Sequence, residues 1–270
     1  MSLSAEKIEH NLATRLIGKT VIVYESVDST NEILKKISRE RKYNGLAIFA
    51  RHQQKGKGRN GRIWQAPQDS SILCSTLVFL EESVHETFGA VMLASAIATA
   101  QAISKTFPSA KIRIKWPNDI YCGKRKLAGV LIESSTAYFE EKPVSAFIIG
   151  IGINCKQEKT EFPAEIADAA CSISQILNRT VSDEEMIFLA KALLEELDFR
   201  IVRIANNDFS TLRDEWLQLA GDLDDSISVI QGNRKFSARI VDIDVTDGSL
   251  LVQDYNGMIV HLQQNAAKII

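Results

Sequence analysis

The chain has 270 residues, of which 45% are hydrophobic and 24% are charged, and this is the usage of an ordinary globular protein. Its formal net charge of −2 provides no overall attraction to nucleic acid or to an anionic membrane, which argues against a protein whose whole surface binds polyanions. The length allows one large domain, or one domain with a small appendage.

The N-terminal residues predict a short helix over 3–16, where apolar side chains recur at helical spacing, and then a strand over Val21–Tyr24. Only about 20 residues precede that strand, too few for a helix-turn-helix domain of its own. No signal peptide is expected, because the first ten residues are mixed and charged.

A helix start is predicted next, because Ser29 and Glu32 have the spacing of a capping box. Ser29, Thr30 and Asn31 would then present polar side chains and free backbone N–H groups at the first turn. Two interpretations stay open at this point. The residues either cap the helix or hold a small polar ligand.

A basic, glycine-rich loop over 51–64 (RHQQKGKGRNGRIW) follows an apolar strand over Leu46–Ala50. It has no acidic residue, and its glycines alternate with five cations: Arg51, Lys55, Lys57, Arg59 and Arg62. Glycine lets a backbone approach a ligand closely, so the loop can direct amides and cations at one anionic group such as a carboxylate or phosphate. A solvated, flexible basic turn is the alternative.

Further strands are predicted over Ile72–Phe79 and Lys111–Trp116, separated by a buried helix over 89–106 that is short for a membrane span. The second strand alternates strictly, with Ile112, Ile114 and Trp116 on one face and Lys111, Arg113 and Lys115 on the other. Pro117 ends it. Lys115 is thus the last cation of its face, beside Asn118 and Asp119, and strand ends next to polar turns are where sites are built.

Three more strands are predicted over Ile120–Cys122, Lys126–Glu133 and Ala146–Asn154. The last two contain Gly129, Gly150 and Gly152. Glycine weakens a strand unless something must approach closely, which favours a flat ligand on the sheet; bulges or tight packing are the alternative.

The remainder predicts irregular structure over 156–181, a helix from a second capping box at Ser182 to Asn206, and a helix over Phe209–Ala220. From Asp222 onward, Gly-Asn, Asp-Gly and Asn-Gly turns separate short strands. This predicts a small β-barrel-like module over 222–270, attached to a domain over 1–221.

Several chemistries have no support. The four histidines are scattered and no HExxH or Cys/His cluster exists, so a protein-bound zinc is not expected. There is no GxSxG elbow, no P-loop and no GxGxxG. The four cysteines form no CxxC pair, so reduced thiols in a cytoplasmic protein are expected.

Five motifs together resemble those of biotin–protein ligases. They are VDSTN at 27–31, QQKGKGRNGRIW at 53–64, KWPND at 115–119, KLAGVLIE at 126–133 and GIGIN at 150–154. The order and spacing match across residues 20–221, and the C-terminal module matches more loosely. The resemblance implies an α+β fold, with a central mixed sheet flanked by helices, related to class II synthetases, and an SH3-like C-terminal β-barrel.

The resemblance also implies an activity. Biotin would be activated by ATP as biotinyl-5′-AMP, with Mg²⁺ bound mainly through the nucleotide, and then transferred to a lysine of a biotin carboxyl carrier protein. No DNA or membrane partner is expected, because the N-terminus is short and the net charge is negative, and a homodimer stays open. The nearest rival is a lipoate ligase or octanoyl transferase of the same fold, and a second rival is a non-catalytic biotin-sensing regulator.

The family's functional residues map onto this sequence position by position. Lys115 and Arg59 would be catalytic. Biotin would be bound by Ser29, Thr30, Asn31, Gln53, Lys57, Gly58, Arg59 and Lys115. The nucleotide would be bound by Arg59, Arg62, Trp64, Asn118, Asp119 and Asn154.

Two departures from the family pattern stand out. Lys57 occupies the place of the first arginine of GRGR, which keeps the charge and loses the bidentate fork, so weaker loop ordering is expected. The chain end, LQQNAAKII, lacks the family's Gly-Glu turn and final arginine. A contact from the C-terminal module to the site loops therefore has no sequence support.

Overall fold

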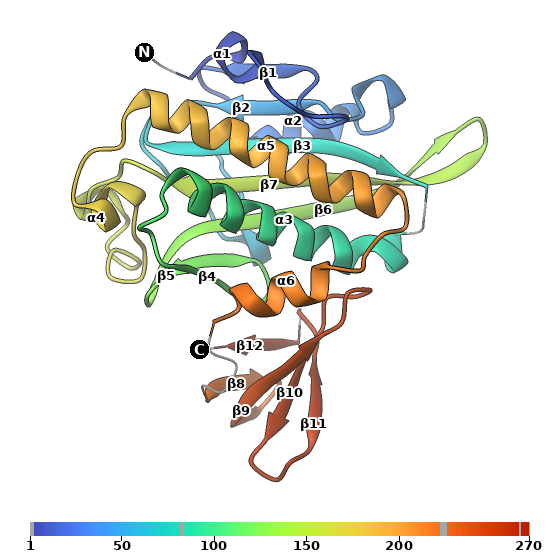
Figure 1. Cartoon of the computed structure of the whole chain (residues 1–270), viewed down its shortest axis with the longest axis vertical. Coiled ribbons are helices and arrows are strands. Elements are labelled where there is room, and N and C mark those ends of the chain that lie inside the picture. Colours follow the sequence, from blue (N-terminus) through green and yellow to red (C-terminus); the bar gives the residue numbers. More distant parts are fainter. Residues whose placement is uncertain (1–2, 82–83, 222–225, 265, 270) are drawn as a thin grey trace.

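The computed structural model describes residues 3–81, 84–221, 226–264 and 266–269. Its larger part is built on a seven-stranded sheet in the order β1-β2-β3-β7-β6-β5-β4, and a separate five-stranded sheet follows in the chain (Figure 1). In the large sheet β1 and β2 are parallel and every other neighbouring pair is antiparallel. The predicted α+β class with a central mixed sheet is confirmed.

The large sheet has one apolar face and one face with a small, polar centre, and a register shift interrupts the alternation between Ile120 and Tyr121. Its strands are β1 (Val21–Tyr24), β2 (Ala47–Ala50), β3 (Ser71–Leu80), β4 (Ile112–Lys115), β5 (Asp119–Cys122), β6 (Arg125–Phe139) and β7 (Lys142–Asn154). One face carries β-branched side chains such as Ile151 and Ile153, which are 3% and 0% exposed. The other carries Ser75, Gly150, Gly152 and Gly129, so its central part is small and polar.

Two long helices, α3 (Val84–Thr106) and α5 (Asp183–Ala205), pack on each other and cover the apolar face (Figure 1). Helix α3 is apolar and long enough to cross a membrane over Glu86–Thr106, but 83% of its most apolar window is buried. It is therefore a core helix. On the opposite face, α2 (Thr30–Ile37) packs on β2, β3 and β7 through Leu34.

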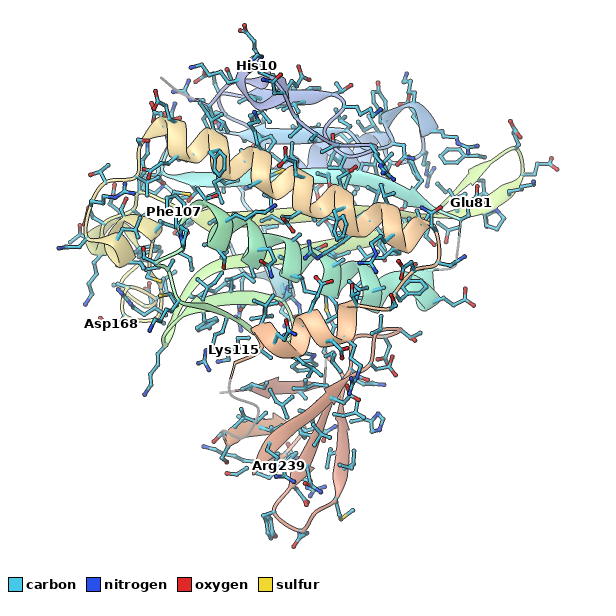
Figure 2. The ribbon with its side chains drawn as sticks, viewed as in Figure 1. His10, Glu81, Phe107, Lys115, Asp168 and Arg239 are labelled. Atoms are coloured by element: carbon cyan, nitrogen blue, oxygen red, sulfur yellow. The ribbon has the colours of Figure 1, made fainter. Side chains whose placement is uncertain are left out.

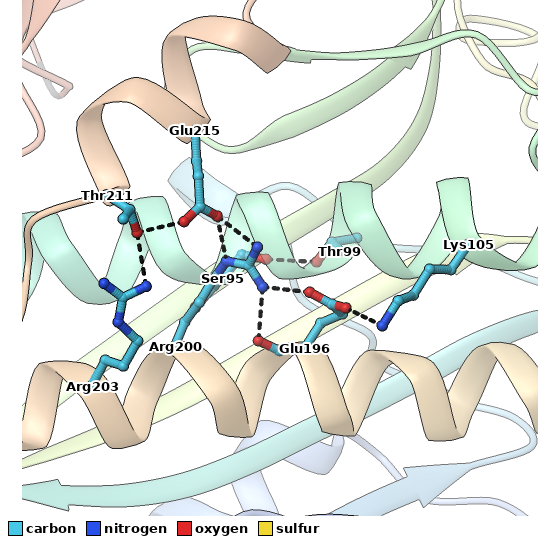
Figure 3. A network of polar contacts seen from close by, with 8 residues as sticks. All are labelled: Ser95, Thr99, Lys105, Glu196, Arg200, Arg203, Thr211 and Glu215. Atoms are coloured by element: carbon cyan, nitrogen blue, oxygen red, sulfur yellow. Dashed lines mark hydrogen bonds and ion pairs between the residues drawn. The ribbon is translucent and has the colours of Figure 1, made fainter.

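A buried ion-pair network ties α5 to α6 (Leu212–Leu219) beside α3 (Figure 3). Arg200 is 5% exposed and donates to Glu196 Oε2 at 2.5 Å and to Glu215 Oε2 at 2.6 Å. Lys105 of α3 pairs with the other oxygen of Glu196 at 2.6 Å. Because every charge in this cluster has an opposite partner, the three helices can bury it.

The C-terminal module is an antiparallel sheet in the order β11-β10-β9-β8-β12. Its strands are β8 (Ile227–Gln231), β9 (Arg234–Ile243), β10 (Leu250–Asp254), β11 (Ile259–Leu262) and β12 (Ala267–Ile269). The predicted turn glycines Gly232, Gly248 and Gly257 all have positive φ. Residues 222–225, where the predicted domain boundary falls, lie outside the described residues.

The module lies directly against the large part. Trp116 Nε1 donates to the carbonyl of Gly248 at 2.9 Å, and Gly89 N donates to the carbonyl of Thr246 at 2.9 Å. A Cβ on Gly89 would lie 2.4 Å from Gly248 N, so this approach requires glycine.

Several predicted boundaries were wrong. Helix α1 spans only Ala5–Glu9, and Asn11 has a φ of 55°, which no helix interior adopts. Strands β6 and β7 continue beyond the predicted ends and join in a hairpin at Glu140, while α4 (Ile173–Leu177) lies in a region predicted as irregular. The capping box at Ser182 is confirmed. The one at Ser29 was wrong: Ser29 is the N-cap residue, but its side chain makes no capping hydrogen bond.

Candidate functional site

One register row crosses the large sheet and joins residues from three of the five motifs. Lys115 pairs with Asp119, Asp119 with Gly129, and Gly129 with Gly152. The row continues through Leu73 to Ala50, where the basic loop begins. Cross-strand partners share a face of the sheet. Residues distant in sequence therefore form a single surface with a glycine centre.

The indole of Trp64 occupies that glycine centre. A Cβ on Gly152 would lie 2.5 Å from Trp64 Cε2, and a Cβ on Gly129 would lie 3.2 Å from Trp64 Cζ3. Lys126 Nζ lies 5.6 Å from the ring centroid, within cation–π range. The flat group that these two glycines accommodate is thus a side chain of the loop itself. Among the described residues none accepts a hydrogen bond from the buried Trp64 Nε1.

Gly150 leaves room for a different side chain, that of Asn31. A Cβ at this position would lie 2.3 Å from Asn31 Oδ1. The three strand glycines therefore admit one indole and one amide, which explains why a strand interior lacks side chains there.

Residues 56–64 form a tight hairpin. Trp64 N donates to Gly56 O at 2.9 Å and Gly58 N donates to Arg62 O at 2.8 Å. A Cβ on Gly56 would lie 2.3 Å from Trp64 O, so only glycine permits this closure. At the tip, Asn60 and Gly61 have φ values of 55° and 73°. The loop is consequently folded around its glycines rather than open.

The first cation of the loop closes its base. Arg51 makes a bidentate pair with Asp69, with Nε to Oδ1 at 2.6 Å and Nη2 to Oδ2 at 2.7 Å. Its third nitrogen pairs with Glu25. Asp69 follows the loop and lies just before β3, so the pair joins the two ends of the segment. Arg51 therefore closes the base of the loop through its ion pairs with Asp69 and Glu25.

The next two cations hold the loop to the segment before α2 and to the first turn of α2. Lys55 Nζ pairs with Asp28 at 2.9 Å, and Lys57 Nζ pairs with Glu32. The Lys57 hydrogen bond lowers the pKa of Glu32 against the opposing effect of burial. Lys57, which departs from the family pattern, thus binds the first turn of α2 and tethers the loop there. Gly58 follows it and pairs with Arg62 through the backbone.

Arg59 points toward Asn118, beside the Lys115 end of the row. Its Nη1 donates to Asn118 Oδ1 at 3.1 Å and its Nη2 donates to the carbonyl of Gln264 at 3.2 Å. Burial lowers the pKa of Arg59, while the charge of Asp119 opposes that change. A contact between the site loop and the C-terminal module therefore exists, and it uses a backbone carbonyl, which the sequence motif could not reveal. Arg62 is exposed.

Lys115 lies at the β4 edge of the large sheet, the edge next to the C-terminal module (Figure 2). Its Nζ lies 5.1 Å from the ring centroid of Tyr121. Asp119, its register partner, forms an ion pair with Lys126 Nζ at 2.6 Å. Burial raises the pKa of Tyr121, and the charge of Asp119 adds to that shift. Lys126 was missed among the sequence-based site residues, although it opens the KLAGVLIE motif.

The predicted biotin-binding residues Thr30, Asn31 and Gln53 form one hydrogen-bonded cluster. Gln53 Oε1 accepts from Thr30 N at 2.7 Å and from Thr30 Oγ1 at 3.0 Å. Ser75 links Thr30 Oγ1 to Asn31 Oδ1, at 2.6 Å to each. Ser29 is buried at the start of the same helix.

Ser75 of β3 and Glu133 of β6 belong to this cluster and were not predicted. The signal that could have found Glu133 is its place at the end of KLAGVLIE, where a charge interrupts an apolar strand. Ser75 carries no such signal, because its strand is buried on both faces.

Asn154 is 4% exposed and both ends of its amide are used inside the protein. Nδ2 donates to Cys171 O at 3.0 Å, and Oδ1 accepts from Gln157 Nε2 at 3.1 Å. The described contacts give it a structural role at the end of β7.

The model of the biotin/lipoate A/B protein ligase family matches residues 23–154, which span every one of the five motifs. Over these residues the chain matches the biotin/lipoate A/B protein ligase family. It is 27% identical to the bifunctional ligase/repressor BirA of Bacillus subtilis (strain 168) over 95% of this chain and 76% of that protein. It is 29% identical to the biotin–[acetyl-CoA-carboxylase] ligase of Mycobacterium tuberculosis over 73% of this chain and 72% of that one.

Among solved structures, the biotin protein ligase of Aquifex aeolicus in complex with biotin and ATP is similar to this chain, with a TM-score of 0.72 at 25% identity. The match covers 93% of this chain and 99% of the other. The likeness therefore includes the five-stranded module as well as the large sheet.

Proposed function

We propose that this chain is an ATP-dependent biotin–protein ligase that forms biotinyl-5′-AMP and transfers biotin to a lysine of a biotin carboxyl carrier protein. The observation that carries the proposal is the convergence of the motifs on one sheet face. A polar cluster around Asn31 lies at one end, Lys115 and Arg59 at the other, and the Trp64 loop between them. Both the family and the Aquifex aeolicus ligase, solved with biotin and ATP, support it.

In the first step a carboxylate oxygen of biotin attacks the α-phosphorus of ATP. The bond from that phosphorus to the bridging oxygen breaks, and pyrophosphate leaves with the electron pair. Two anions must approach each other, and cations held in place lower the energy of doing so. Lys115 and Arg59 would supply that charge. Burial of Arg59 strengthens its interaction with phosphate oxygens, because less water screens it.

In the second step the amine of a carrier lysine attacks the acyl carbon of the mixed anhydride. A carbon–nitrogen bond forms, the acyl–phosphate oxygen bond breaks, AMP leaves, and the amine loses a proton. Asn118 and Asp119 lie at the Lys115 edge where this lysine would arrive. The hairpin over 56–64 would cover the adenylate and keep water from it, with Trp64 holding its far end on the glycines.

Magnesium, which the resemblance implies, would enter mainly on the phosphates of ATP. In the described part of the chain no group of three or more His, Cys, Asp or Glu side chains could hold a metal ion. The carboxylate at the catalytic edge, Asp119, is paired with Lys126 at 2.6 Å. The roles assigned to Lys115 and Arg59 do not depend on a metal ligand from the protein.

Incubation of the protein with ATP and either biotin or lipoate tests the proposed function. Pyrophosphate release with biotin, followed by labelling of a biotin carrier domain, is the expected result. Pyrophosphate release only with lipoate would assign the chain to the lipoate branch of its family. Normal adenylate formation without carrier labelling would instead indicate a biotin-sensing regulator.

A further inference from the structure

A half-buried carboxylate stands behind the polar cluster, and none of the roles above uses it. The side chain of Glu133 on β6 is 25% exposed. Its Oε2 accepts from Asn31 Nδ2 at 2.9 Å, and its Oε1 accepts from Lys35 Nζ at 3.1 Å. One oxygen is thus committed to a buried amide and the other to a lysine at the surface.

The carboxylate decides which edge of the Asn31 amide points where. An ionised carboxylate can only accept hydrogen bonds, so Asn31 must present its NH₂ group to Glu133. Its Oδ1 then faces Ser75, whose hydroxyl donates to it at 2.6 Å. Ser75 could serve either edge of the amide, because a hydroxyl both donates and accepts. Glu133 is therefore the partner that selects one orientation of the Asn31 amide.

At the other end of the cluster, a hydrogen-bond donor fixes the orientation of the Gln53 amide. The backbone N–H of Thr30 can only donate, and Gln53 Oε1 accepts from it at 2.7 Å. The Gln53 amide nitrogen consequently points away from the helix. The hydroxyls of Thr30 and Ser75 lie 2.6 Å apart and carry one hydrogen each. When they donate to Gln53 Oε1 and Asn31 Oδ1, no hydrogen remains for the contact between them. The donor-only N–H thus fixes the Gln53 amide, and the acceptor-only carboxylate fixes the Asn31 amide.

Steric confinement prevents Asn31 from escaping this arrangement. The residue is 4% exposed. A Cβ on Gly150 would lie 2.3 Å from Asn31 Oδ1, so the amide packs directly on the backbone of Gly150. It can flip about its own axis but has little room to move aside. Its polarity thus depends on its hydrogen-bond partners.

We propose that Glu133 is a positioning residue for biotin: it fixes the Asn31 amide and with it the donor–acceptor pattern offered to the ureido ring. The inference rests on the proposed function. A cyclic urea has one carbonyl acceptor and two N–H donors. If the Asn31 amide were reversed, its NH₂ group would face a urea N–H, or its oxygen would face the urea carbonyl, and buried polar atoms would be left unpaired. Glu133 acts through Asn31 and does not itself touch the ring.

The test compares Glu133→Gln with Lys35→Met in the full-length chain, by titration with biotin and with dethiobiotin, which keeps the urea and lacks the sulfur. Glutamine has the shape of glutamate but can offer either an oxygen or an NH₂ group, so it no longer selects one amide edge. We expect the dissociation constant of both ligands to rise about tenfold in Glu133→Gln. Lys35→Met leaves the carboxylate of Glu133 in place and should change the dissociation constants less than about threefold. KM for ATP should be unchanged in both.

Wild-type affinity for biotin in Glu133→Gln would overturn the inference and leave the proposed function intact. So would a loss restricted to biotin, because the urea is common to both ligands. An equal rise in KM for ATP would show that Glu133 supports the fold and not the ureido contact. A wild-type chain that binds no biotin would overturn the proposed function together with this inference.

Discussion

Arg59 Nη2 donates to the backbone carbonyl of Gln264 at 3.2 Å, across 205 positions of sequence. The same guanidinium donates to Asn118 Oδ1 through Nη1. One side chain of the site loop therefore joins the KWPND turn to the C-terminal module. Because the module contributes a main-chain oxygen, its terminal side chains are free to differ from the family pattern.

Loss of the Arg59 fork should release the adenylate. In Arg59→Gly, biotinyl-5′-AMP should dissociate about 10- to 100-fold faster, since hydrogen bonds to a charged group contribute about 1.5–3 kcal/mol. Arg59→Lys keeps the charge and loses the fork, so it should fall between wild type and glycine. Quenched-flow or filter assays of free adenylate measure this. Equal retention in all three proteins would contradict the assigned role.

Lys115 and Arg113 offer a matched pair on one face of β4, two residues apart. Lys115→Ala should slow biotin-dependent pyrophosphate exchange by about 100-fold, the scale of removing one charge-stabilising group. Arg113→Ala, which removes an exposed cation further from Asp119, should leave the rate within about twofold. If Lys115→Ala labels a carrier domain at the normal rate, its proposed role is wrong.

The Lys57–Glu32 pair should make loop order depend on pH and salt. The Lys57 hydrogen bond lowers the pKa of Glu32, so the stabilisation is present above the ordinary carboxyl range and is lost as pH falls through the lowered folded-state pKa. The hydrogen-exchange protection factors of residues 56–64, which correct for the intrinsic pH dependence of amide exchange, should therefore fall in acid and at high salt. Glu32→Gln should show fast exchange at neutral pH as well. An exchange rate in Glu32→Gln equal to wild type at neutral pH would dismiss the tether.

Lys57→Arg tests the departure from the family separately. Arginine could hold Glu32 with two parallel hydrogen bonds, so we expect slower exchange of the loop and longer retention of the adenylate. No change in adenylate retention would count against the prediction that lysine weakens loop order.

Two alanine substitutions test which glycine the Trp64 indole depends on for its position. Gly152→Ala puts a Cβ 2.5 Å from the Trp64 ring, and Gly129→Ala puts one 3.2 Å away, with the flexible end of Lys126 as its other neighbour. The first must displace the indole, while the second can be absorbed. We expect a red-shifted Trp64 emission and a raised KM for ATP in Gly152→Ala, and much smaller changes in Gly129→Ala. Similar values for both variants would mean that the indole does not rest on Gly152.

The buried network should affect stability without touching the site. Arg200→Met leaves Glu215 without its cation and Glu196 with Lys105 alone, and the free energy of unfolding should fall by about 3–5 kcal/mol. Arg213 pairs with Asp242 at 2.6 Å on an exposed surface, so Arg213→Met should cost far less. Urea denaturation measures both, and KM for biotin and ATP should stay constant. A fall in Arg213→Met as large as in Arg200→Met would contradict the role of burial.

Hydrophobic period, turn glycines and one capping box were enough to predict most strands and the long helices, while the fold class came from the resemblance to biotin–protein ligases. Strand β4 and its two faces follow from strict alternation, and α5 begins at the predicted Ser182. The predicted helix over 3–16 and the irregular region over 156–181 failed, because a single Asn11 in the left-handed region and a short five-residue helix at Ile173 leave little periodic signal.

The sequence by itself determined five motifs whose order and spacing match those of one family, and this resemblance predicts that their cations, glycines and small polar residues share a site. Only the tertiary structure decided which partner each of these residues contacts. It pairs Arg51, Lys55 and Lys57 with acidic residues and Arg59 with Asn118, places an indole on two glycines and an amide on the third, and brings Glu133 next to Asn31. The physical reason is that charge pairing and close packing depend on distances between strands. Those distances follow from sheet register and have no trace in local sequence.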